Sequence, residues 1–186
     1  MIRLETDRLI LRDYDESDFD DYFTLMSDEK TMYYLQDIML HTREEAEAEF
    51  KKILADMRDP RREYYFLRME LKKTREQVGS IGYTVTGDAP QGKTVHLGYF
   101  TFPRFWGNGY TTEAAKRVLE YAFAEDGVYR VTTGCLKENA GSEAVMLKCG
   151  LKKEAELPDH VLHDGKMKTR LEYGLTKSEW ESAAEK

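Results

Sequence analysis

The sequence predicts one α+β domain, in which a mixed, mostly antiparallel sheet of about seven strands is flanked by about four helices. Three observations lead to this prediction. Two helical stretches lie in the first third of the chain, and three aromatic or apolar strand-like runs follow them. Two further helical stretches then alternate with strands, and the short polar links between neighbouring runs favour an antiparallel meander.

Length and composition fit a single globular domain over residues 1–186, with 41% apolar and 34% charged residues. No apolar run approaches the roughly 20 residues that span a bilayer, and the N-terminus lacks the apolar region of a signal peptide. The net charge of −7 argues against a nucleic-acid partner. Cys135 and Cys149 lie in core-like patterns, so we expect buried reduced thiols and a cytoplasmic protein.

The first element is a strand over residues 4–12, rich in leucine and isoleucine. Ser17 is expected to cap a short helix over residues 18–26, whose first-turn acids form a solvated helix start. Residues 28–39 have no clear period and are interpreted as a packed connector or as part of a binding site. Thr42 and Glu45 then have the spacing of a capping box, which opens a helix ending near residue 57.

Strand-like runs make up most of the remaining chain. They are joined by polar or glycine-rich turns, and a glycine, Gly150, is expected to cap the short helix over residues 139–148. The tail from Ser178 is interpreted as partly helical. The runs cover residues 64–70, 78–86, 94–101, 128–135, 151–157 and 166–176.

A glycine-rich turn between a strand and a helix is the most informative stretch. Pro103 ends the strand, and Gly107 and Gly109 permit positive φ angles and a close approach to the backbone. The helix that follows has one apolar face. Unpaired amides at such a helix start favour a phosphate or pyrophosphate, and Arg104 could add a cation. A plain glycine turn is the alternative, and the P-loop and dinucleotide fingerprints are both missing.

Residues 104–109, Arg-Phe-Trp-Gly-Asn-Gly, match the Arg/Gln-x-x-Gly-x-Gly/Ala signature of the GNAT N-acetyltransferase superfamily. Residues 4–12, 96–100 and 110–114 resemble the branch of that family that contains the ribosomal-protein N-terminal acetyltransferases. Asn139-x-x-Ser142 and the Lys-Cys-Gly-Leu that ends at residue 151 are similar to a second family element. The resemblance covers nearly the whole chain and implies the acyl-CoA N-acyltransferase fold.

By this resemblance the chain is an enzyme that uses acetyl-CoA as cosubstrate and needs no metal. It would transfer the acetyl group directly, in a ternary complex, to a primary amine: a protein N-terminus, or a small amine such as a polyamine, amino acid or aminoglycoside. The resemblance also implies which residues would contact the cofactor, from the end of the strand through the glycine turn and at the second motif. They are Tyr99, Phe100, Phe102, Arg104, Phe105, Trp106, Gly107, Asn108, Gly109, Tyr110, Thr111, Asn139 and Ser142.

The general acid is where this sequence departs from the broad family. Many members place a tyrosine seven residues after the asparagine, where this chain has Met146, which cannot donate a proton. The resembled branch uses a serine instead, so Ser142 is the candidate acid, with helix capping as its other possible role. Tyr99 and Tyr110 are weaker candidates.

Two residues are candidates for the general base. Glu154 matches the position of a proposed catalytic glutamate in the resembled branch. His96 lies on the strand before the glycine turn, and the ordinary pKa of histidine, about 6.5, suits proton removal, although a strand histidine can also be structural. Thr169 replaces an aspartate that relatives commonly carry, which leaves the mode of acceptor binding open.

Two rival functions follow from the same residues. Met146 at the tyrosine position favours a non-catalytic domain that binds or senses acyl-CoA, and the glycine turn alone would also suit a nucleotide-binding structural protein. His160 and His163 do not form a cluster with the spacing of metal ligands, so we expect no metal. A homodimer is possible by resemblance.

Overall fold

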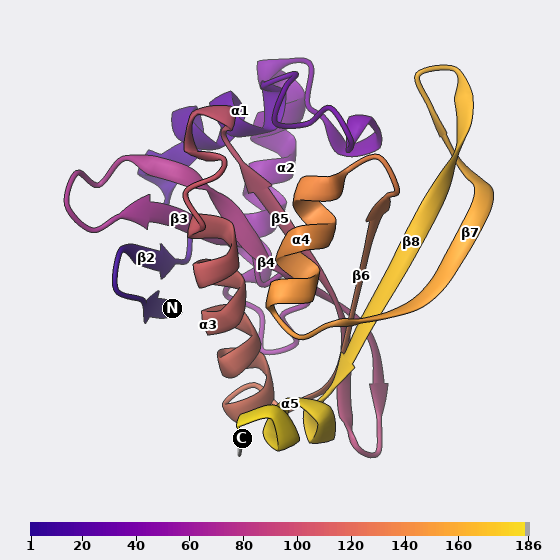
Figure 1. Ribbon diagram of the computed structural model, residues 1–186. Helices are drawn as coiled ribbons and strands as arrows, with labels where there is room; N and C mark the ends of the chain where they lie inside the picture. The colour runs from indigo at the N-terminus through magenta and orange to yellow at the C-terminus, as the bar shows by residue number, and fades with distance from the viewer. Residues whose placement is uncertain (185–186) are drawn as a thin grey trace.

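The computed structural model describes residues 1–184, which fold into eight strands, five α-helices and three short 3₁₀ turns (Figure 1). The elements follow the predicted order, except that the predicted first strand is two strands, which makes eight strands where about seven were expected. In chain order they are β1 (Arg3–Glu5), β2 (Leu9–Arg12), α1 (Phe19–Ser27), α2 (Arg43–Asp56), β3 (Leu67–Leu71), β4 (Gln77–Ala89), β5 (Gly92–Thr101), α3 (Tyr110–Ala124), β6 (Val128–Leu136), α4 (Ala140–Lys148), β7 (Lys152–His163), β8 (Lys166–Thr176) and α5 (Lys177–Ala184).

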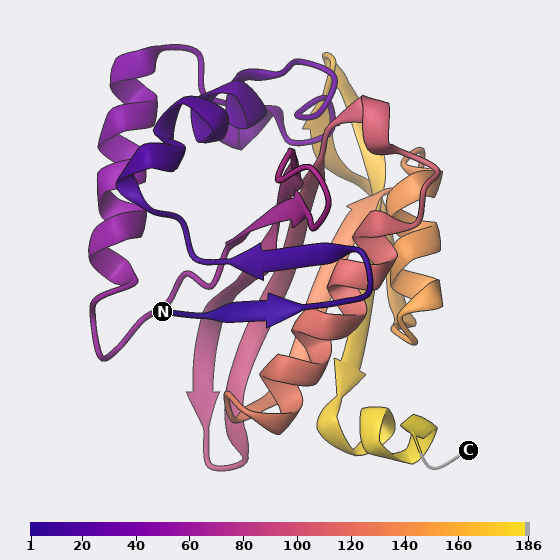
Figure 2. The same ribbon diagram turned by 90° about the vertical axis from the view of Figure 1, so that its left-hand side faces the viewer.

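The strands form one mixed sheet in the order β1-β2-β3-β4-β5-β6-β8-β7. Every neighbouring pair is antiparallel except β5 and β6, which are parallel and are connected through α3. Figure 2 shows the layers, with α1 and α2 on one face of the sheet and α3 and α4 on the other. None of the helices in the described part of the chain is long and apolar enough to cross a membrane.

The parallel pair separates partway along its length. β5 and β6 pair only from Lys93 and Val128 to His96 and Thr132. Beyond that point β5 pairs with β4 alone, and residues 133–136 of β6 pair with β8 alone. The two strands therefore splay apart, and their facing edges carry backbone groups that no neighbouring strand takes up.

Apolar packing on both faces holds this splayed sheet. The larger core lies under α3, whose buried residues are those of the predicted apolar face: Ala114, Ala115, Val118, Leu119, Ala122 and Phe123. A smaller core on the other face joins the sheet to α1 and α2 through side chains that include Tyr14, Leu25, Phe50 and Phe100. Each face of the sheet thus has its own core.

Three predictions about elements were wrong in detail. Residues 4–12 form a hairpin of two strands, β1 and β2, because Thr6 binds back to Leu9 and reverses the chain. Ser17 is not a helix cap: the Asp15 side chain accepts its N–H at 2.9 Å and opens a 3₁₀ turn before α1. The expected loop around His160 and His163 is strand, because β7 runs to His163 and the turn is confined to residues 164–165.

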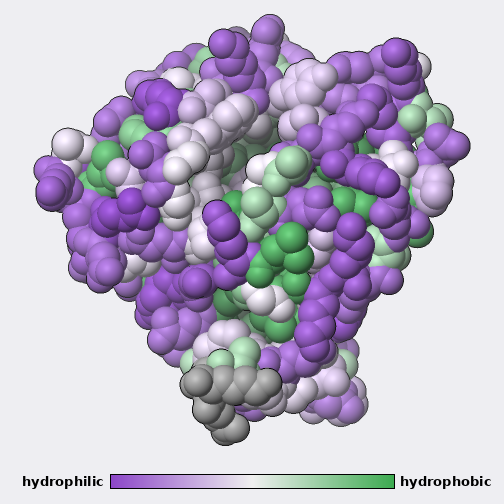
Figure 3. All heavy atoms as spheres, in the orientation of Figure 1, coloured by the Kyte–Doolittle hydropathy of each residue, from purple (hydrophilic) through white to green (hydrophobic). Residues whose placement is uncertain are grey.

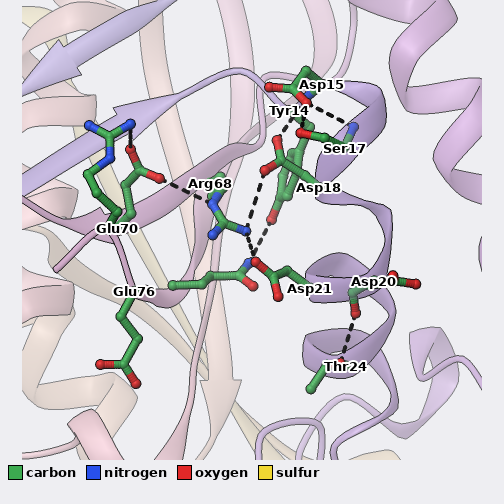
Figure 4. Close-up of polar contacts among 12 residues, drawn as sticks. Tyr14, Asp15, Ser17, Asp18, Asp20, Asp21, Thr24, Arg68, Glu70 and Glu76 are labelled. Carbon is green, nitrogen blue, oxygen red and sulfur yellow. Dashed lines mark hydrogen bonds and ion pairs between the residues drawn. The ribbon is translucent and has the colours of Figure 1, made fainter.

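The sequence predicted that the first-turn acids of α1 are solvated, but not all of them are. Asp18 is buried and binds the Arg12 guanidinium at 2.7 and 2.8 Å. Arg68 of β3, also buried, reaches the carboxylates of Asp21 at 2.7 Å and Glu70 at 3.3 Å (Figure 4). These ion pairs fix the start of α1 against β2 and β3, so Asp18 acts in packing, whereas Asp20 and Asp21 are exposed.

The capping box of α2 gives a first testable prediction. Thr42 Oγ1 accepts the Glu45 N–H at 3.2 Å, and Glu45 Oε2 accepts the Thr42 N–H at 3.1 Å. We expect Thr42→Ala to lower the free energy of unfolding by about 1 kcal/mol, measured by urea denaturation. Thr24→Ala, in an exposed position of α1, is the control and should change it by less than about 0.5 kcal/mol. Equal losses in the two variants would contradict the capping role.

Candidate active site

A cleft of about 1620 Å³ opens where β5 and β6 separate. Its walls come from the start of α3, from α4, from residues 30–41 between α1 and α2, and from the end of the β7–β8 hairpin. In Figure 3, pale and green atoms gather around α4 at the centre of an otherwise hydrophilic face. The cleft therefore passes through the sheet and can be reached from both of its faces.

The glycine turn forms one end of this cleft. Gly107 and Gly109 have φ angles of 76° and 78°, as the sequence predicts. Gly109 is the residue before α3, where no side chain caps the helix, and the first helical bond runs from the Glu113 N–H to the Gly109 carbonyl. The amides of the first turn before Glu113 are thus left without helical partners, next to the positive end of the helix dipole. This arrangement fits a pyrophosphate.

Of the residues predicted to bind the cofactor around the turn, some face the cleft and some do not. Phe105, Trp106, Gly107, Gly109, Tyr110 and Thr111 line it. Asn108 instead shapes the turn, because its Nδ2 donates to the carbonyls of Phe105 and Trp106 at 3.1 Å. Phe102 lies in the smaller core.

Arg104, the cation expected at the turn, does not line the cleft. Its Nε lies 3.2 Å from Glu76 Oε1, and its guanidinium lies 4.4 Å from the ring centroid of Phe102, outside the cleft. Lys148, at the end of α4, lines the cleft instead, and the part of the chain that the structure describes offers it no ion pair. Sequence reasoning missed Lys148 because its position depends on how α4 packs.

Along the free edge of β5, the backbone N–H and C=O groups of the odd-numbered residues point into the cleft. Thr133 Oγ1 donates to the Leu97 carbonyl, and Trp106 Nε1 donates to the Thr101 carbonyl, whereas the Phe102 N–H turns toward β4. Because backbone groups alternate along a strand, the N–H and C=O of Tyr99 face the cleft between these two positions. Tyr99 and Phe100 both line the cleft, as expected.

A pair of hydroxyl groups lies beside this edge. Tyr99 Oη is 2.8 Å from Ser142 Oγ, and burial raises the pKa of Tyr99, which keeps its phenol protonated. Asn139 caps α4 by accepting the Ser142 N–H at 3.1 Å, so Ser142 is not itself the cap. Met146 is buried in the larger core. The cleft therefore contains a hydroxyl pair from β5 and α4, and that this pair replaces the missing tyrosine stays a prediction.

His96 lies at the point where β5 and β6 separate. Because side chains alternate along a strand, it faces the α1 and α2 side, opposite to Tyr99. Thr132 Oγ1 donates to the Val95 carbonyl and lies 3.4 Å from His96 Nδ1. Burial, with a contribution from the charge of Arg170, lowers the pKa of His96 and favours the neutral base.

Glu154, the other candidate base, is not brought to the cleft. It is exposed, and its carboxylate binds the Arg130 guanidinium at 2.7 Å. It lies over Gly174: a Cβ added to this glycine would fall 2.3 Å from Glu154 Oε1. Gly174 pairs with Thr132 and Thr132 with His96, so Glu154 lies two strands away from the histidine.

The segment between α1 and α2 covers the cleft and is held at the tip of the β7–β8 hairpin. Tyr33 Oη donates to Asp164 Oδ2 at 2.7 Å, and Gln36 Nε2 donates to Asp164 Oδ1 at 3.0 Å. His163 Nε2 lies 2.7 Å from the Tyr33 carbonyl, and its ring packs on Tyr34. These contacts join positions about 130 residues apart in the chain. The sequence alone therefore showed only an aromatic run without a period and could not predict the contacts.

His163 thus has a structural partner, and His160 is exposed on β7. Within residues 1–184, no group of three or more His, Cys, Asp or Glu side chains is arranged to hold a metal ion. Cys135 and Cys149 are free thiols, the first buried and the second half-buried. Burial raises the pKa of both thiols, that of Cys149 to about 11.

Comparisons with known proteins agree on one family. Residues 8–152 match the model of the acetyltransferase (GNAT) domain. The uncharacterized N-acetyltransferase YoaA of Bacillus subtilis is 31% identical over 87% of this chain and 89% of its own. The ribosomal-protein-S5-alanine acetyltransferase of Vibrio fischeri superposes with a TM-score of 0.84 at 16% identity, over 97% and 99% of the chains. For spermidine N-acetyltransferase of Vibrio cholerae, in complex with CoA and spermine, the TM-score is 0.79 at 16% identity, over 94% and 99%.

Proposed function

This chain belongs to the GNAT acetyltransferase family, and on that premise we propose that it transfers an acetyl group from acetyl-CoA directly to a primary amine. The observation that carries the proposal is the split between β5 and β6, with the glycine turn at one end and His96 at its base. The relatives include enzymes named for a ribosomal protein and for spermidine, so they leave the acceptor open.

The residues of the cleft fit the cosubstrate. The glycine turn and the free amides at the start of α3 would hold the pyrophosphate, and Lys148 would add a cation. The backbone of Tyr99 would contact the extended arm and donate to the thioester oxygen as negative charge develops there. When bound, acetyl-CoA supplies the acetyl group as an activated thioester. The turn and the strand edge would hold it on the side of the sheet that carries α3 and α4.

The amine would enter from the opposite face, where His96 lies. A ring nitrogen of His96, which is neutral because burial lowers its pKa, would remove the proton from the amine as the amine nitrogen bonds to the acetyl carbon. The carbon–sulfur bond breaks, and the Tyr99–Ser142 hydroxyl pair would donate a proton to the departing sulfur. Protons and bonds then balance, with one proton leaving the amine and one reaching the thiol.

Direct transfer agrees with the state of the two cysteines. An acyl carrier would need a thiolate, and the raised pKa of Cys135 and Cys149 keeps both thiols protonated near neutral pH. Access to the cleft from both faces of the sheet would also let both substrates bind together, which supplies rate through proximity. A single domain, a cytoplasmic location and a homodimer stay predictions.

Calorimetric titration with acetyl-CoA, followed by free-thiol release against a panel of peptides and small amines, tests the proposed function. Binding with acceptor-dependent thiol release would establish the transfer and name the acceptor. Binding without release over the whole panel would favour a domain that senses acyl-CoA. If ATP or NAD displaced CoA, the glycine turn would instead serve a nucleotide, and the assignment of the cleft would be wrong.

The hydroxyl pair gives a second testable prediction. We expect Ser142→Ala and Tyr99→Phe each to lower kcat about tenfold while changing the Kd of acetyl-CoA less than about threefold, because the pair acts on the leaving group. The double variant should lose little more than either single one. Tyr121→Phe removes a hydroxyl outside the cleft and is the control. Parallel losses in kcat and affinity would indicate a binding role instead.

A further inference from the structure

An arginine with a free guanidinium edge lies in the acceptor half of the cleft. Arg170 of β8 lines the cleft, and its Nε donates to Glu172 Oε1 at 2.5 Å. Within residues 1–184, Glu172 is the ion-pair partner of the guanidinium, and neither terminal nitrogen forms a hydrogen bond. The guanidinium is thus oriented by Glu172 and leaves a pair of donors that matches a carboxylate.

A glycine makes this orientation possible. A Cβ on Gly134 of β6 would fall 2.8 Å from Arg170 Nη2 and 2.7 Å from Glu172 Oε2, so both side chains lie flat on the strand at that position. Gly134 is two residues from Thr132, which pairs with His96, so Gly134, Thr132 and His96 share one face of the sheet. The charge of Arg170 reaches His96 and helps to lower the pKa of that histidine. The free donors thus lie on the same face of the sheet as the candidate base, close enough for the charge of Arg170 to act on it.

The other charged groups of the cleft are close to balance. Three of its four carboxylates are occupied: Glu45 in the capping box, Glu49 by Lys52 at 2.9 Å, and Glu138 by Lys168. Within the described residues, Asp37 has no such partner, and neither do the cations Lys30 and Lys148. Because Glu172 pairs with Arg170, positive and negative charges around the cleft are nearly equal, and it is the free donors of Arg170 that favour an anionic group.

Part of the remaining wall is apolar. Leu35, Ile38 and Met39 line the cleft from the segment between α1 and α2, and Val161 and Leu162 line it from the β7–β8 hairpin. These side chains would surround an apolar substituent next to the free donors of Arg170.

Building on the proposed acetyl transfer, we propose that the acceptor is an α-amino acid with an apolar side chain. Its carboxylate binds the Nη1 and Nη2 edge of Arg170 while its amine faces His96. Glu172 is a positioning residue, since it fixes the guanidinium through Nε. Acetylation removes the positive charge of the amine and leaves the carboxylate, so the N-acetyl product keeps the group that Arg170 recognises.

The test compares leucine, methionine and phenylalanine with their carboxamides, with spermidine added as a polycation. We expect turnover of the free acids, and we expect Arg170→Gln to reduce the ratio of kcat/KM between acid and amide about tenfold, because a charge-assisted pair is lost at a partly exposed site. Comparing this ratio between the parent and the variant cancels the different basicity of the two amines, which is the same with both proteins. Arg130→Gln is the matched control: it removes an arginine that faces Glu154 outside the cleft and should change the ratio less than about twofold.

A second readout does not need turnover. N-acetyl-leucine and N-acetyl-leucinamide are titrated with the CoA-loaded protein, and the free acid should bind about tenfold more tightly in the parent but not in Arg170→Gln. If transfer occurs to spermidine or equally to the amides, and the acid preference is missing, this proposal is wrong while the proposed function stands. If no amine reacts but the acid still binds through Arg170, the transfer fails and the carboxylate site stands.

Discussion

Replacing His96 with glutamine is expected to lower kcat/KM by about 10²- to 10⁴-fold, the range that general-base catalysis supplies. Glutamine keeps much of the size and polarity of the imidazole but cannot accept the proton. The acetyl-CoA affinity should change little, because His96 and the glycine turn lie at different parts of the cleft. The measurement is steady-state thiol release together with calorimetry on the same preparation.

The pH profile tests the same residue in a second way. Burial lowers the pKa of His96 below its usual 6.5, so the neutral base is fully present above that value and is lost as the pH falls through the lowered pKa. If the free amine is the substrate, log kcat/KM should rise with slope two below the His96 pKa and with slope one above it, up to the pKa of the amine. In His96→Gln the slope should stay at one throughout.

His160→Gln is the matched control, because His160 is exposed on β7 and does not line the cleft. It should retain both the rate and the second limb of the pH profile. A second limb that survives in His96→Gln, or a loss of less than about fivefold in kcat/KM, would assign the base to another group or to water.

The sequence predicted best what neighbouring residues determine. The apolar face of α3 follows from its own period, the cap of α2 from Thr42 and Glu45, and the turn from the φ angles that Gly107 and Gly109 adopt. Each of these features depends on residues within a few positions of one another, so a local pattern is sufficient to predict it.

What the sequence missed depends on distant partners. Arg104 and Glu154 match family positions, yet each is drawn to an oppositely charged side chain of another element, Glu76 and Arg130. Arg170 had no motif at all: its orientation depends on Gly134 across the strand pair. Such pairings are set by sheet register and packing, which no local pattern encodes.

The glycine turn carries the other large expected effect. We expect Gly107→Val to raise the Kd of acetyl-CoA about 100-fold, measured by calorimetry. A β-branched residue at φ 76° costs about 1–3 kcal/mol, so the free turn relaxes to another conformation and binding must restore the strained one. A Cβ would also stand on the surface that the pyrophosphate has to approach, although no protein atom lies within 4 Å of it.

Gly127→Val separates strain from recognition, because the two glycines are closely matched. Gly127 has a φ of 68°, a Cβ there would also meet no atom within 4 Å, and it follows α3 at the end away from the cleft. Both variants should therefore lose a similar free energy of unfolding, about 1–3 kcal/mol, but Gly127→Val should bind acetyl-CoA as the parent does. Equal weakening of binding in both variants would mean that general destabilisation is the cause. Unchanged affinity in Gly107→Val would place the pyrophosphate elsewhere, and the free amides at the start of α3 would then need another ligand.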